Sequence, residues 1–162
     1  MNDLLTDPKM SPKRFAGYYA DFDFQLFPDV QNPDVFLRTQ RGNCQDYAIL
    51  ADYVLKRKDY ETILVRVVLV GTIAHDVCYV AQVKSYLDYN NRVYFKTLQG
   101  CPGNLRAIAN KVADSFDANW TTASAYTYTY DEDIKHMKLT VVKSDPPSED
   151  PQGGIPLPSD LR

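Results

Sequence analysis

After a short polar stretch at residues 40–43, apolar residues recur at helical spacing, and this pattern predicts the central helix of the protein. Its buried stripe repeats at i, i+4, i+7 and i+11 and consists of Cys44, Ala48, Ala51 and Leu55. Asn43 is a suitable N-cap, because its side-chain oxygen can accept a hydrogen bond from a free amide of the first turn. Gly42 is expected to let the chain turn sharply into this cap. The sequence therefore predicts a helix from Cys44 to Lys56 that begins at a cysteine.

Three other segments have helical patterns. Ser11 and Pro12 suit the N-cap and first turn of a short helix that ends near Tyr19. Asn32 and Pro33 open a second short helix, over residues 35–39. A third amphipathic helix is predicted after the loop at residues 100–104, from a stripe that consists of Leu105, Ile108, Ala109, Val112, Phe116 and Trp120.

Runs of β-branched and aromatic residues predict the strands. Residues 62–70 are nearly all apolar, which favours a central strand. Residues 75–80 and 85–89 are predicted as the next two strands, and residues 93–98 as a fourth strand or an irregular segment. In the second strand His75 shares a face with positions 77 and 79, because side chains alternate across a strand.

Two further stretches have extended patterns. Residues 121–130 alternate tyrosine with threonine or alanine, and with residues 138–142 they predict an antiparallel hairpin around residues 131–134. Residues 21–27 also alternate, but Pro28 limits them to an edge strand or an extended arm. Helices followed by a mostly antiparallel sheet with one more helix indicate an α+β domain. We expect a single domain over residues 1–144 and a proline-rich, disordered tail over residues 145–162.

Size and charge narrow the possible functions. A chain of 162 residues suits one domain, and a net charge of −3 argues against nucleic acid as a partner. No 18-residue apolar run is present, so no membrane span is expected. The first twenty residues contain no signal-peptide apolar core. Two compartments stay open: the cytoplasm if the chain is complete, and an exported location if a leader was removed.

A thiol hydrolase needs a thiolate, a base beside it and a group that orients the base. Cys44 is predicted in the first turn of a helix, where the dipole and free amides stabilise a thiolate. His75 begins a strand, and Asp88 lies on the next strand of a short hairpin, within plausible reach of the ring. Taken singly, each has an ordinary structural explanation: a buried cysteine, a packed imidazole and a turn-capping carboxylate.

The three motifs together resemble the transglutaminase-like superfamily, and most nearly the bacterial transglutaminase-like cysteine proteinases. The resemblance rests on residues 42–48 (GNCQDYA), 74–80 (AHDVCYV) and 86–90 (YLDYN) and covers about residues 33–92. It implies a papain-like or transglutaminase-like α+β fold, with the cysteine helix packed on a mostly antiparallel sheet. By position it implies Cys44 as nucleophile, His75 as general acid and base, and Asp88 as the orienting carboxylate. The Cys44 amide and a donor such as Gln40 would form the oxyanion hole.

No metal or other cofactor is expected. In the calcium-dependent members of the resembled family the residues that flank the cysteine are acidic, whereas here they are the neutral Asn43 and Gln45. Asp46 is acidic but points elsewhere on the helix, where it can cap the helix or fix a loop. A zinc site built from His75, Cys78 and Cys101 is disfavoured, because residues three apart on a strand face opposite sides and no fourth ligand with zinc-finger spacing is present.

The sequence thus predicts a thiol hydrolase that cleaves peptide or isopeptide amides, with a protein or peptide substrate as its partner. Two alternatives stay open. One is a catalytically silent binding or scaffolding module of the same fold, since fold does not guarantee activity. The other is a protein-glutamine acyltransferase, a transglutaminase, which would need a site that excludes water.

Overall fold

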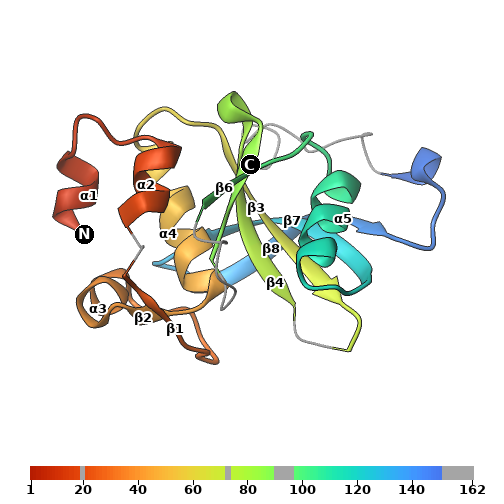
Figure 1. The fold of residues 1–162 in the computed structure, drawn as a ribbon, viewed down its shortest axis with the longest axis horizontal. Helices are drawn as coiled ribbons and strands as arrows, with labels where there is room; N and C mark the ends of the chain where they lie inside the picture. The colour runs from red at the N-terminus through yellow and green to blue at the C-terminus, as the bar shows by residue number, and fades with distance from the viewer. Residues whose placement is uncertain (19–20, 72–73, 90–96, 151–162) are drawn as a thin grey trace.

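The computed structural model of the chain describes residues 1–18, 21–71, 74–89 and 97–150 (Figure 1). Short helices and strands make up the first part of the chain: α1 (Asn2–Thr6), α2 (Pro12–Tyr18), β1 (Asp23–Phe24), α3 (Pro33–Thr39) and β2 (Arg41–Gly42). The remaining elements are α4 (Cys44–Lys56), β3 (Thr62–Leu69), β4 (His75–Val80), the 3-10 turn η1 (Ala81–Val83), β5 (Ser85–Asp88), β6 (Thr97–Gly100), α5 (Leu105–Ser115), β7 (Trp120–Thr129), β8 (Ile134–Val142) and the 3-10 turn η2 (Pro147–Glu149).

One six-stranded sheet organises the molecule. Its strand order is β6-β5-β4-β3-β7-β8, and every neighbouring pair of strands is antiparallel. The apolar strand β3 lies inside the sheet between β4 and β7, as its composition predicted. The short strands β1 and β2 pair in parallel and form a separate ribbon. The fold is therefore α+β, with the cysteine helix packed against an antiparallel sheet, as expected.

Helices cover both faces of the sheet (Figure 1). On one face, α4 and the N-terminal helices bury a core that includes Leu64, Cys78 and Leu87. On the other face, α5 packs against Val65, Val77 and their neighbours. Alternate residues of β4 belong to the two cores, because successive side chains of a strand point to opposite faces.

Most predicted elements are present, with some differences. The α4 bounds agree with the prediction, whereas Trp120 begins β7 instead of continuing α5. The fourth strand is β6, and residues 93–96 of its predicted range lie outside the described residues. The helix α1 was not predicted. Among the described residues, no helix is both long and apolar enough to cross a membrane.

The segment after β8 contacts α5. Arg106 donates to the carboxylate of Asp150 at 2.6 and 2.7 Å and to backbone carbonyls of residues 142, 143 and 145. The guanidinium fork thereby holds residues 143–150 beside the helix. Residues 151–162 lie outside the described residues, so the division into a domain and a disordered tail stays a prediction.

Candidate active site

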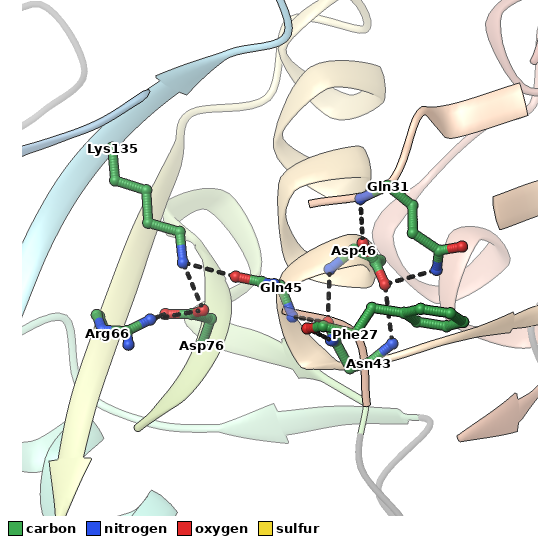
Figure 2. Close-up of polar contacts among 8 residues, drawn as sticks. All are labelled: Phe27, Gln31, Asn43, Gln45, Asp46, Arg66, Asp76 and Lys135. Carbon is green, nitrogen blue, oxygen red and sulfur yellow. Dashed lines mark hydrogen bonds and ion pairs between the residues drawn. The ribbon is translucent and has the colours of Figure 1, made fainter. Parts of the chain in front are cut away.

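The start of α4 is held by a reciprocal capping box, which positions Cys44 as the first residue of the helix. The side-chain oxygen of Asn43 accepts hydrogen bonds from the amides of Gln45 (3.1 Å) and Asp46 (3.3 Å). The Asp46 carboxylate in turn accepts from the Asn43 amide at 3.0 Å (Figure 2). These bonds satisfy amides that have no partner within the helix, and they leave the thiol at a defined place.

Asp46 also fixes the loop that precedes the site. Its carboxylate accepts from the backbone amide of Gln31 at 2.7 Å and from the Gln31 side chain at 2.8 Å (Figure 2). Asn43 donates its side-chain amide to the carbonyl of Phe27 at 3.1 Å. Burial raises the pKa of Asp46, although the hydrogen bonds from Gln31 and Asn43 favour its ionised form and oppose that rise. Asp46 therefore performs both of the structural roles expected for it.

Gly42 is required by close packing and does not adopt a left-handed conformation. Gly71 is the glycine with a positive φ among the described residues, and Gly42 is paired in β2. A Cβ atom at Gly42 would lie 2.5 Å from a ring carbon of Phe36 and 2.9 Å from an oxygen of Asp46. A glycine is needed because the Phe36 ring and the capping carboxylate occupy the space of a side chain.

His75 and Asp88 meet at the end of the sheet. Strand register pairs position 78 with position 87, so Asp88 faces the same side as His75 and lies diagonal to it. The Nε2 atom of His75 lies 2.5 Å from Oδ1 of Asp88, and both side chains are buried. The side chain of Cys44 is close enough to the imidazole to raise the pKa of His75. The three residues singled out from the sequence are therefore neighbours in space.

The surroundings of His75 favour its protonated form. Burial of the ring lowers the pKa of His75, but the neighbouring Asp88 carboxylate and the Cys44 side chain raise it, and the resulting pKa lies well above 6.5. The ring of Phe116 stands edge-on to the imidazole with centroids 4.8 Å apart. Phe116 lies at the C-terminus of α5, and its contact with the imidazole adds to the burial of His75.

Gln40, the other two cysteines and the second histidine belong to other parts of the fold. Gln40 is exposed at the C-terminus of α3 in a left-handed conformation, and its carbonyl accepts from the amide of Asp23. Cys78 and Cys101 belong to opposite cores, and burial raises the pKa of both thiols. His136 is exposed on β8 and lies 2.7 Å from the carboxylate of Glu132. Within the described parts of the chain, no group of three acidic, histidine or cysteine side chains is arranged to hold a metal.

A polar cluster beside the site was not predicted. The ammonium of Lys135 donates to the side-chain oxygen of Gln45 at 2.8 Å and lies 3.2 Å from the carboxylate of Asp76. Arg66 lies 3.3 Å from the same carboxylate (Figure 2). No local pattern could reveal this cluster, because its members come from three strands and the helix.

Comparison with known proteins finds distant likenesses among solved structures. No protein-family model matches the chain, and no curated protein matches it by sequence. Among solved structures, LapG from Legionella pneumophila is similar with a TM-score of 0.48 at 14% identity, over 91% of this chain and 76% of that chain. Its calcium-bound form has a TM-score of 0.48 at 14% identity, over 94% and 80% of the two chains. These likenesses are too distant to assign a role to any residue, so the roles proposed below rest on the geometry of this chain.

Proposed function

We propose that the chain is a thiol hydrolase that cleaves peptide or isopeptide amide bonds with Cys44, His75 and Asp88. The observation that carries this proposal is the connected buried arrangement of the three side chains. Asp88 lies 2.5 Å from His75, the Cys44 side chain is close enough to the same ring to raise its pKa, and Cys44 begins a capped helix. A nucleophile beside a base that a third group orients is the arrangement that acyl transfer requires.

Each residue has a defined task in the proposed reaction. The Cys44 thiolate attacks the carbonyl carbon of the scissile amide, and the oxygen becomes an oxyanion. The imidazolium of His75 gives its proton to the departing amine as the C–N bond breaks, which leaves a thioester on Cys44. His75 then takes a proton from water, whose oxygen attacks the thioester. The carboxylic acid leaves, and the thiolate returns.

Asp88 supports this proton transfer. A buried carboxylate beside the ring stabilises the imidazolium and holds the ring in one orientation, so the other edge can serve the sulfur. This agrees with the raised pKa of His75. For the oxyanion we propose the backbone amide of Cys44, at the positive end of the helix dipole, and the side chain of Gln40. Replacement of Gln40 by alanine tests the second donor, with an expected fall in the rate of turnover.

Site-resolved alkylation tests the activated thiol. Iodoacetamide is applied between pH 5 and 9 to the wild type and to the His75→Gln and Asp88→Asn variants, and each modified cysteine is quantified by mass spectrometry. We expect Cys44 to react below pH 7 in the wild type and to lose that reactivity in both variants. Cys78 and Cys101 are internal controls, because burial raises the pKa of both thiols. Equal behaviour of all three cysteines would overturn the proposal, provided circular dichroism shows that the variants are folded.

A second experiment separates hydrolysis from the alternatives. Wild-type protein and a Cys44→Ala control are incubated with a peptide library and with a biotinylated primary amine. New peptide termini that depend on Cys44 support the hydrolase. Amine incorporation in preference to hydrolysis would identify an acyltransferase. Binding of peptides without either product would identify a binding module and contradict catalysis.

A further inference from the structure

The Lys135 side chain connects the two halves of the proposed active site. Its ammonium donates to Gln45 at 2.8 Å and contacts Asp76 at 3.2 Å. Gln45 directly follows Cys44 in the chain, and Asp76 directly follows His75. A single cation therefore binds the helix beside the nucleophile and the strand beside the base (Figure 2).

The Lys135 contacts lie where they can fix the position of α4 relative to β4. Asp76 is 2% exposed, and Arg66, its partner across the β3–β4 register, lies 3.3 Å away and already compensates part of its charge. The Arg66 contact stays within the sheet. The Lys135 contact leaves the sheet and reaches α4, since Gln45 lies on that helix.

Thr62 of β3 also donates to the Asp52 carboxylate at 2.7 Å, but Asp52 lies further along α4 than Cys44. Nearer Cys44, the contacts between α4 and the sheet are less directional. The side chains between them, such as Ala48, Leu64 and Cys78, are apolar or nearly so, and apolar contacts permit sliding. A hydrogen bond loses strength steeply with angle, so the Lys135 contacts limit such movement at the end of the helix that bears Cys44. The Tyr126 ring, whose centroid is 5.5 Å from the ammonium, lies below Lys135 and restricts its position.

We propose that Lys135 is a positioning residue that holds the N-terminus of α4 against the start of β4. In this role it sets the placement of the Cys44 sulfur relative to the His75 ring. The inference rests on the proposed function, because it concerns the same pair of side chains. Lys135 does not touch the reacting atoms; it acts through Gln45 on one side and Asp76 on the other.

The test compares Lys135→Met, Lys135→Arg and Gln45→Ala with the wild type, and Lys138→Met serves as a control on an exposed lysine of the same strand. The second-order rate constant for alkylation of Cys44 is measured from pH 5 to 9. A misplacement of about 1 Å costs on the order of 100-fold in rate, so we expect at least about a tenfold loss near neutral pH in Lys135→Met. Lys135→Arg restores part of the rate, because it retains a cation and donors.

The double variant of Lys135 and Gln45 tests whether Lys135 acts through Gln45. Lys135→Met and Gln45→Ala should each slow alkylation, and the double variant should be no slower than the worse single variant. Independent, multiplicative losses would overturn the clamp, as would a wild-type rate in Lys135→Met. A loss of stability without a change in the pH profile would assign Lys135 a purely structural role and also overturn it.

A structural readout keeps the two proposals distinguishable. In a crystal structure of Lys135→Met, we expect the N-terminus of α4 to shift relative to β4, with a longer distance from the Cys44 sulfur to the His75 ring. An unchanged distance contradicts the clamp whatever the reactivity of Cys44. If wild-type Cys44 shows no dependence on His75, the hydrolase proposal fails, and the crystallographic distance still decides the role of Lys135.

Discussion

Replacement of Gly42 by alanine should destabilise the protein, because the space of one methyl group is already filled. The added Cβ would lie 2.5 and 2.6 Å from two ring carbons of Phe36 and 2.9 Å from Oδ2 of Asp46. Carbon atoms in contact are ordinarily about 3.5–4.0 Å apart, so the overlap with the ring is about 1 Å. Some part of this corner of the fold has to move.

The cost follows from what surrounds the site. Overpacking of a well-packed core costs about 1–3 kcal/mol. Phe36 is 1% exposed and has little room to retreat, and Asp46 is held by hydrogen bonds from Gln31 and Asn43. Displacement of Asp46 would weaken the capping box, and a lost helix cap costs about 1 kcal/mol. We therefore expect Gly42→Ala to lower the free energy of unfolding by about 3 kcal/mol.

Urea denaturation followed by circular dichroism measures this change. Gly17→Ala is the matched control, since Gly17 lies in α2, is not left-handed and has nothing within 4 Å of the position that an added methyl group would take. That substitution should stabilise the protein by up to about 1 kcal/mol, because alanine is the better helix former. In addition, Phe36→Leu should relieve the clash, so the double variant with Gly42→Ala should be about 1 kcal/mol or more above additivity. A loss below about 0.5 kcal/mol for Gly42→Ala, or strict additivity, would refute the packing argument.

Three further predictions concern polar contacts. Asp88→Asn should remove the stabilisation that the raised pKa of His75 gives the folded protein. That stabilisation is complete below pH 6.5 and is lost as the pH rises through the higher pKa of the folded state, so the urea midpoints of the variant and the wild type should converge at alkaline pH. A difference between the midpoints that widens with pH would contradict this prediction. Thr62→Val should lower the free energy of unfolding by about 1.5–3 kcal/mol in urea melts, because it removes the 2.7 Å hydrogen bond to the buried Asp52 carboxylate; no change would count against that bond. Arg106→Gln should speed trypsin cleavage beyond β8, since its fork holds that segment, and an unchanged cleavage rate would argue against this anchor.

Local sequence patterns were sufficient for the elements that bear the candidate site. The apolar stripe and the Asn43 cap predicted the observed bounds of α4, because helical period and capping depend on residues a few positions apart. The strands that carry His75 and Asp88 were predicted from composition, and a short antiparallel hairpin brings its two strands together in a narrow range of registers. These signals named the three residues that the structure brings together, and their catalytic role remains the proposal to be tested.

Helical spacing alone misassigned Trp120. The apolar stripe of α5 runs on to this position, but α5 ends at Ser115 and Trp120 begins β7. Its indole donates to Asn110 of α5 at 2.7 Å, so the ring packs back on the helix from the sheet. Spacing along the chain cannot separate these cases, because a side chain on a neighbouring strand can fill the same core as the next turn of a helix.

The amino-acid sequence by itself determined the cysteine helix, its cap, the order of the strands along the chain and the chemical types present at the site. Only the tertiary structure decided why position 42 is a glycine and which cation lies beside the site. Lys135 and Gln45 are 90 residues apart, and the Phe36 ring that fills the space at Gly42 belongs to a different helix from the one that Gly42 precedes. Contacts of this kind depend on the packing of whole elements, and such packing has no periodic signature in the sequence.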